Sequence, residues 1–270
     1  MNDCPLGVPG PHRLATAMAF GLSDTGPVRR HNEDNFLVDC DLQLMAVADG
    51  MGGHEAGAQA SALALNTLRE CLSGQPPTPP TSLDPDATCQ MPGMAAITTL
   101  KAAIEQVNAR LYAQNEARRM SEGQGMGTTL TGVWRRDPLG PLILFHVGDS
   151  RLYRYRDGEL LQLSRDQTWY QQALDAGHFD RLPSRNLLLQ AIGPSRRVEP
   201  EIGLHQVQPG DVLLLCSDGV HGSVPHQELA QALDSLRVES MAEVCQQLIQ
   251  LAADYGGRDN ATVLLAMCER

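Results

Sequence analysis

Five aspartates, each at the end of an apolar run or inside a short turn-like motif, constrain this sequence more than any other feature. Three of them follow runs that are typical of buried strands, namely residues 45–48, 143–147 and 212–216. Strands that each deliver a carboxylate to one place create a site rich in oxygen ligands. Hard divalent cations such as Mg²⁺ and Mn²⁺ prefer such ligands. The five aspartates are Asp34, Asp49, Asp149, Asp218 and Asp259.

The order and wording of the motifs around these aspartates resemble the metal-dependent serine/threonine protein phosphatases of the protein phosphatase 2C (PPM) family. The resemblance runs from about Ala17 to Met267, and the wording of the first two motifs is similar to the bacterial branch. One such motif alone carries little weight, whereas five in the family's order are a strong joint match. The motifs are Val28-Arg29-Arg30-His31-Asn32-Glu33-Asp34, Asp49-Gly50-Met51-Gly52-Gly53-His54, Gly148-Asp149-Ser150-Arg151, Ser217-Asp218-Gly219 and Gly257-Arg258-Asp259-Asn260.

The resemblance implies an α+β fold, a four-layer αββα sandwich of two mainly antiparallel β-sheets flanked by antiparallel helix pairs. Hydrophobic periodicity in the sequence independently predicts helices over residues 54–72, 94–121 and around 241–255. Strands and paired long helices segregate along the chain, which suits stacked sheets with helices outside. Strands are expected at 14–22, 35–40, 42–48, 128–135, 142–147, 152–156, 160–163, 187–192, 201–206, 212–216 and 261–267.

A length of 270 residues with 42% hydrophobic residues is enough for one large domain. We expect a flexible arm over residues 1–12 and a single phosphatase-like domain over 13–270. Within that domain, residues 73–93 hold six prolines and predict a surface loop insertion. Residues 166–186 match the family's mobile flap beside the active site. Leu182-Pro183 stands there in place of the usual His-Pro, so substrate choice is the least transferable property.

The net charge of −11 argues against a nucleic-acid or anionic-membrane partner, since either needs a basic face. No apolar run approaches the ~20 residues of a membrane span. The seven cysteines are scattered without a CxxC pair, so we expect no zinc site or disulfide framework. Several lie in apolar runs and are expected to be buried thiols, which favours a reducing cytoplasm.

The resemblance also assigns roles in a metal site. Asp49 would bridge two Mn²⁺ or Mg²⁺ ions, with the Gly50 carbonyl as a further oxygen ligand. Asp218 and Asp259 would complete the first ion, and Asp34 with Glu33 would hold the second through water. Asp149 would bind a possible third ion. The alternative for any one aspartate is a turn or helix-capping residue.

Arg29 matches the arginine that binds phosphate in the family, where a guanidinium fork can hold two oxygens. Its alternative is an ordinary surface arginine. Thr128-Thr129 also matches the family and is interpreted as structural. Some family members place a histidine where this chain has Met51, so the group that protonates the leaving oxygen stays open between His54, a metal-bound water and none.

The resulting hypothesis is a cytoplasmic, monomeric enzyme that hydrolyses phosphoserine and phosphothreonine in proteins. A binuclear metal centre would activate a bridging water, and the enzyme would counteract a bacterial serine/threonine kinase by acting on that kinase and its substrates. The alternative is a catalytically silent module that keeps the fold and only binds phosphoproteins. No cysteine phosphatase signature or GxxxxGK phosphate loop is present in the sequence, so neither of those chemistries is supported.

Overall fold

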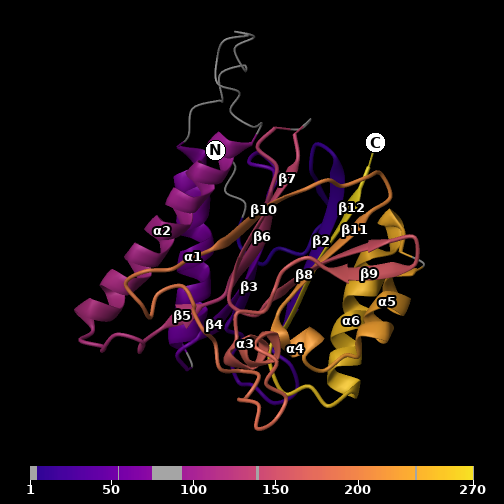
Figure 1. Cartoon of the computed structure of the whole chain (residues 1–270). Helices are drawn as coiled ribbons and strands as arrows, with labels where there is room; N and C mark the ends of the chain where they lie inside the picture. Colours follow the sequence, from indigo (N-terminus) through magenta and orange to yellow (C-terminus); the bar gives the residue numbers. More distant parts are fainter. Residues whose placement is uncertain (1–4, 54, 75–92, 138–139, 235, 270) are drawn as a thin grey trace.

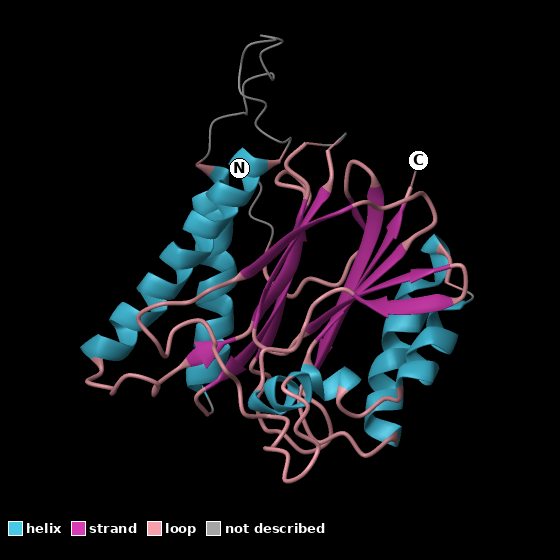
Figure 2. Cartoon of the chain, in the orientation of Figure 1, coloured by secondary structure: helices cyan, strands magenta, loops and turns pink. Residues whose placement is uncertain are grey.

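Two antiparallel sheets packed face to face form the centre of the molecule, and helices cover both outer faces (Figure 1, Figure 2). The computed structural model describes residues 5–53, 55–74, 93–137, 140–234 and 236–269. The four layers and the α+β class are those that the sequence predicts. In the described part of the chain, no helix has the length and apolar character needed to cross a membrane.

The first sheet contains six strands, all paired antiparallel. Its central strand β11 is buried at every residue, and β12 is buried at all but one, because they lie between the second sheet and a helical layer. In spatial order the strands are β1 (His12–Arg13), β2 (Ala17–Asp24), β12 (Ala261–Cys268), β11 (Val212–Cys216), β8 (Arg151–Arg156) and β9 (Glu159–Gln162).

The second sheet has the same number of strands and the same antiparallel pairing. Its order is β10 (Glu201–His205), β7 (Leu142–Val147), β6 (Leu130–Trp134), β4 (Leu44–Met51) and β3 (Asp34–Asp39), and the short strand β5 (Gly127–Thr128) pairs with the end of β4.

Helices α1 (Glu55–Ser73) and α2 (Met94–Ala117) cover the second sheet, while α5 (His226–Asp234) and α6 (Met241–Asp254) cover the first. A 3₁₀ turn (Val238–Ser240) precedes α6. Three apolar cores result, one under each helix pair and one between the sheets.

The apolar stripe of α2 shows what holds a helix layer to its sheet. Leu100, Ile104, Val107 and Leu111 lie three or four residues apart and are fully buried. Full burial of such a side chain is worth about 1.5–3 kcal/mol. The stripe therefore holds α2 on the second sheet and determines which face of the helix packs against it.

Strand register brings the ends of both sheets to one edge of the sandwich. In the second sheet Asp34 pairs with Asp49 across β3 and β4. In the first sheet Cys216, at the end of β11, pairs with Val263 near the start of β12. Asp218 begins the short helix α4 (Asp218–His221) directly after β11. Acidic residues far apart in sequence therefore meet at this edge.

Some sequence expectations were wrong. Residues 187–192 form no strand and make only the isolated bridges Thr168↔Leu188 and Thr128↔Ile192. Leu187 and Leu189 are exposed, so the apolar run has no sheet to join. The expected flexible arm is attached over residues 5–12, since the Gly7 amide donates to the Phe36 carbonyl (2.9 Å) and β1 joins the first sheet.

Three of the described helices were not predicted, and the short helix α4 is one of them. Helix α5 packs on the first sheet, and helix α3 (Trp169–Asp175) lies inside the expected flap. Most of the expected Pro-rich insertion, residues 75–92, lies outside the described residues.

Candidate metal centre

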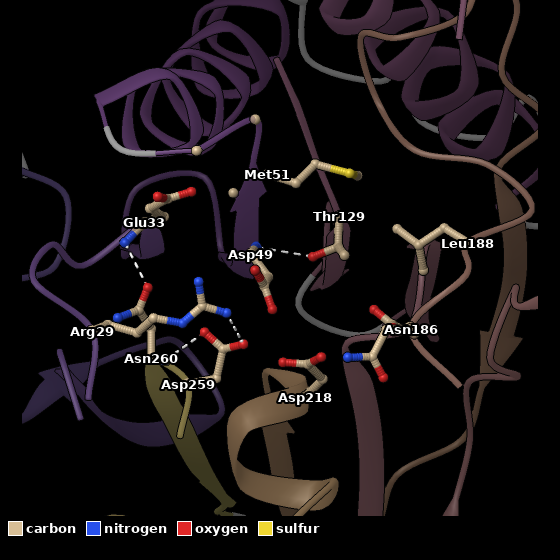
Figure 3. Close-up of a pocket in the computed structure, with 14 residues that line it drawn as sticks. Arg29, Glu33, Asp49, Met51, Thr129, Asn186, Leu188, Asp218, Asp259 and Asn260 are labelled. Atoms are coloured by element: carbon tan, nitrogen blue, oxygen red, sulfur yellow. Dashed lines mark hydrogen bonds and ion pairs between the residues drawn. The ribbon is translucent and has the colours of Figure 1, made fainter. Parts of the chain in front are cut away.

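A cleft of about 230 Å³ lies at the edge where the two sheets deliver their acidic residues. Figure 3 shows Asp49 entering from the second sheet and facing Asp218 and Asp259 from the first. The cleft is smaller than the ~300–1,000 Å³ typical of sites for drug-sized ligands, so it suits ions and a small polar group. Its charged lining residues are Arg29, Glu33, Asp49, Asp149, Asp218 and Asp259.

The main chain of Asp49 is held by two threonines from the neighbouring strand. Its N–H donates to Thr129 Oγ1, and its carbonyl accepts from Thr128 Oγ1 and from the Thr129 N–H, each at 2.9 Å. These bonds satisfy the backbone at the end of β4 and leave the carboxylate to point into the cleft (Figure 3). The structural interpretation of Thr128-Thr129 agrees with this arrangement.

Gly50 occupies a position where no other residue fits. A Cβ atom there would overlap the carbonyl oxygens of Gly57 in α1 and of Glu33. The close approach of β4 to α1 therefore requires glycine. Access of an ion to the Gly50 carbonyl is one reason for a glycine at this position, and packing is a second reason.

Asp34 does not line the cleft. Its side chain is buried, and its Oδ2 accepts hydrogen bonds from Ser217 Oγ (2.6 Å) and Thr262 Oγ1 (2.7 Å). The structure thus connects Asp34 to the first sheet and to the residue that precedes α4. Glu33, the residue before it, does line the cleft.

Asn260 fixes the loop that carries Arg29 and Glu33. Its Oδ1 accepts from the Glu33 N–H at 2.9 Å, and its Nδ2 donates to the carbonyls of Thr25 and His31. In the sequence, Asn260 stands out only as the last residue of the Gly257-Arg258-Asp259-Asn260 motif. Its position directly after Asp259 and directly before β12 is the signal for its role.

Four aspartates at this edge resist ionisation, namely Asp34, Asp49, Asp149 and Asp218. Burial raises the pKa of Asp34 to about 6 and that of Asp149 to about 7. Burial also raises the pKa of Asp218, and it raises that of Asp49 well above its usual range, where Asp34 and Asp218 add repulsion. Positive charge in the cleft would offset both the burial of the ionised carboxylates and the repulsion between them.

The donor set fits Mn²⁺ or Mg²⁺ in kind, because it consists of oxygens and includes no described histidine or cysteine. Among the described residues, however, no three Asp, Glu, His or Cys side chains are gathered closely enough to hold an ion as they stand. The Arg29 guanidinium holds Asp259, with Nη2 2.6 Å from Oδ2. Ion binding would therefore draw the carboxylates together and turn Asp259 away from Arg29.

Arg29 is well placed for an anion in the cleft. Its side chain is 52% exposed and lines the same cleft as the carboxylates. The hydrogen bond to Asp259 raises the pKa of Arg29, so the guanidinium stays charged. Each predicted site residue except Asp34 therefore lines one cleft.

The outer wall contains residues that the sequence argument did not assign. Asn186 and Leu188 lie opposite Arg29 (Figure 3) and come from the segment expected to be the flap or the strand after it. No periodicity or motif distinguished them. Met51 lines the cleft, as its place in the motif suggests, and the candidate acid His54 lies outside the described residues.

Comparison with known proteins identifies the relatives of this architecture. The protein phosphatase 2C family model matches residues 29–263. The serine/threonine protein phosphatase PstP of Mycobacterium tuberculosis is 38% identical over 250 residues, which is 90% of this chain and 43% of PstP. The serine/threonine phosphatase stp of Listeria welshimeri is 34% identical over 253 residues, which is 90% of this chain and 92% of that protein.

A solved structure agrees with the fold. The catalytic domain of the serine/threonine protein phosphatase PstP, in complex with two manganese ions, superposes with a TM-score of 0.77 and 34% identity, and the match covers 94% of this chain and 99% of that one. This chain spans less than half of the length of PstP, yet nearly all of its catalytic domain. By its sequence, its fold and its matching relatives, the chain belongs to the protein phosphatase 2C family.

Proposed function

We propose that this protein hydrolyses phosphoserine and phosphothreonine in other proteins, with Mn²⁺ or Mg²⁺ as cofactor. The observation that carries the proposal is the cleft in which Asp49, Asp149, Asp218 and Asp259 converge beside Arg29. Two relatives named as serine/threonine phosphatases and a related catalytic domain with two manganese ions support it.

Each predicted site residue has a role in this proposal. Asp49 would bridge two ions, Asp218, Asp259 and the Gly50 carbonyl would complete their ligands, and Asp149 would hold a third. Bound ions of this kind supply a water of lowered pKa and positive charge for the phosphate oxygens. Arg29 would grip and orient the phosphate through its guanidinium fork. Asp34 would keep Asp49 and α4 in register, since it bonds Ser217.

The proposed partners follow from the chemistry of the substrate. Phosphoserine and phosphothreonine are made by protein kinases, so we place this enzyme opposite a serine/threonine kinase, acting on that kinase and its substrates. We propose a monomer in the cytoplasm, without nucleic-acid or membrane partners. The buried thiols of Cys216, Cys245 and Cys268 and the net charge of −11 support this setting.

The test compares the enzyme with a silent phosphoprotein-binding module. A phosphothreonine peptide is incubated with protein that has been stripped by EDTA and then supplied with Mn²⁺. The proposal predicts release of phosphate that requires Mn²⁺ and stops again with EDTA. Peptide binding without phosphate release would favour the silent module. Undiminished turnover after exhaustive chelation would contradict the metal mechanism.

A further inference from the structure

The short helix α4 connects two of the proposed ion ligands. Its first residue, Asp218, lines the cleft, and its last residue, His221, does not. Instead, His221 Nε2 lies 2.9 Å from the main-chain carbonyl oxygen of Asp149. Asp149 is 72 positions away in sequence and follows β7 of the other sheet. This contact therefore joins the two sheets directly behind the cleft.

The partner atom determines the proton arrangement on His221. A carbonyl oxygen only accepts, so Nε2 carries the hydrogen and donates it. The other ring nitrogen, Nδ1, is buried and has no hydrogen-bond partner among the described residues. Burial lowers the pKa of His221 to about 3, which keeps the ring neutral. Leaving the buried Nδ1 without a partner costs free energy. The hydrogen bond from Nε2 to the Asp149 carbonyl is the favourable interaction that a histidine makes at this position.

The residues on either side of Asp149 are held by other elements. The Gly148 N–H donates to Gln167 Oε1 at 2.9 Å, and the Gly148 carbonyl accepts from the Gln167 N–H. Ser150 Oγ lies 2.7 Å from Thr129 Oγ1, which in turn accepts from the Asp49 N–H. Both neighbours of Asp149 are thus tied to the second sheet or to Gln167, whereas its own carbonyl is tied to α4.

The start of α4 is held as firmly as its end. Ser217, the residue before the helix, donates to Asp34 Oδ2 at 2.6 Å. Asp34 pairs with Asp49 in the strand register. Helix α4 is therefore fixed at one end near Asp49 and at the other end to Asp149, with Asp218 between these two attachments.

We propose that His221 is a positioning residue that sets the place of Asp149 relative to Asp218, and that it supports binding of the third, weaker cation at Asp149. This inference rests on the proposed function. It assigns His221 no contact with substrate, because the side chain does not line the cleft and its donor faces a main-chain carbonyl. Hydrogen-bonding partners that orient metal ligands typically contribute about 10–100-fold to metal affinity.

The experiment is a calorimetric titration of metal-free protein with Mn²⁺, which needs no turnover. The variant H221L removes the donor at similar bulk, and H221Q offers an amide N–H in its place. H226L is the matched control, because His226 Nε2 makes an equivalent 3.0 Å contact with the Leu160 carbonyl away from the cleft. Thermal midpoints of all variants are measured in the same buffers, so that loss of folding is recognised.

We expect H221L to bind the tighter ions like the wild type and to bind the weakest ion about 10-fold less tightly or worse. H221Q should recover most of that loss, and H226L should leave every affinity unchanged. In the D149A background, H221L should have no further effect on ion binding, since it acts through Asp149.

Three results for H221L and H226L would overturn the inference. They are unchanged affinity for the weakest ion in H221L, equal loss in H226L, and an additive effect of H221L in the D149A background. A wild type that binds two ions, with no further site lost in D149A, would also overturn it while leaving the proposed function intact. A wild type that binds no Mn²⁺ would instead contradict the proposed function itself.

Discussion

The inner wall and the outer rim of the cleft differ in how firmly their side chains are held. On the inner wall, Asp149 is 8% exposed, and Asp34, which supports this wall without lining the cleft, is 5% exposed. Hydroxyl groups of both sheets fix the chain around these two residues. On the rim, the side chains of Arg29 and Asp259 are 52% and 37% exposed and hold each other. The packing of the two sheets thus fixes the positions of the wall side chains. The Arg29–Asp259 ion pair on the rim can open when a substrate binds.

Because of this difference, we expect the buried wall to determine the chemistry and the exposed rim to contribute to the choice of substrate. A buried carboxylate between two sheets can take few positions, so its role follows from the fold. An exposed guanidinium can serve several ligands, and its exposed ion pairs are worth only ~0–1 kcal/mol. We therefore expect large effects from changes to the wall and smaller effects from changes to the rim.

The largest expected effect is at the centre of the wall. D49N should lower kcat at least about 1,000-fold, because it removes a charged ligand from the proposed ion pair. The same variant should raise the thermal midpoint of the metal-free protein, because it relieves repulsion within the buried cluster. Steady-state hydrolysis of a phosphothreonine peptide measures kcat, and thermal unfolding measures the midpoint.

The matched control is D39N, at the opposite end of the same strand pair. Asp39 Oδ1 accepts from the N–H groups of Asp41 and Leu42 in a turn, and an asparagine oxygen can accept the same bonds. Its kcat should stay near the wild-type value. A D49N variant with half or more of the wild-type kcat would remove Asp49 from the mechanism.

The second prediction separates support from direct ligation at Asp34. D34A should lower the free energy of unfolding by about 2–3 kcal/mol, because the hydroxyls of Ser217 and Thr262 lose their buried acceptor. D34N should retain most of the stability, since its amide oxygen can accept. Urea unfolding of metal-free protein gives the values. Unchanged stability in D34A, together with lost Mn²⁺ affinity, would make Asp34 a ligand after all.

The third prediction concerns a proton-sensitive group behind the wall. His146 is fully buried, and its Nδ1 lies 2.8 Å from Thr131 Oγ1. Burial lowers the pKa of His146 to about 4. In the unfolded chain it takes up a proton below about pH 6.5, which the folded state resists. Stability is therefore full above that pH and falls as the pH drops towards 4.

Comparison with H146N isolates this contribution, because asparagine can keep a polar contact with Thr131 and does not titrate. Between pH 7 and pH 5 the wild type should lose about 2 kcal/mol more stability than the variant. Urea unfolding of the wild type and of H146N at pH 7 and at pH 5 gives the four free energies of unfolding. Parallel losses in the two proteins would show that His146 is not the group responsible.

The smallest of the four effects is expected at the rim. R29A should raise KM for a phosphopeptide about 10-fold while changing kcat less, if the guanidinium grips bound phosphate and transition state about equally. R30A, a change at the exposed neighbour, is the control and should leave both constants near the wild-type values. A collapse of kcat at unchanged KM would place Arg29 in the transition state and bring the rim into the chemistry.

The sequence predicted the acidic residues of the cleft better than Asn186 and Leu188, for a physical reason. Each wall aspartate follows a buried strand or pairs within one, and strand patterns are visible in sequence. Leu188 lies in a segment whose apolar residues suggested a strand, and Asn186 directly precedes that segment. The fold gives the segment only isolated bridges. Local propensity does not reveal whether a sheet has room for another strand.

Some missed elements did leave a local signal. Thr168 caps α3 by accepting from the Gln171 N–H, which fits the Thr-x-x-Gln start pattern of a helix. In α5, Leu229 and Leu233 lie four apart and are buried, as an amphipathic helix requires. The contact between His221 and Asp149 has no local signal in the sequence, because it joins distant segments through a main-chain atom.

The most direct test of the account is anomalous diffraction at the manganese absorption edge from crystals grown with Mn²⁺. The central claim is that the carboxylates that line the cleft gather divalent cations. It predicts two strong peaks with Asp49 between them, Asp218 and Asp259 as further ligands, and Asp259 turned away from Arg29. Data without a peak beside Asp49, or with Asp259 still paired to Arg29 at full Mn²⁺ occupancy, would contradict it.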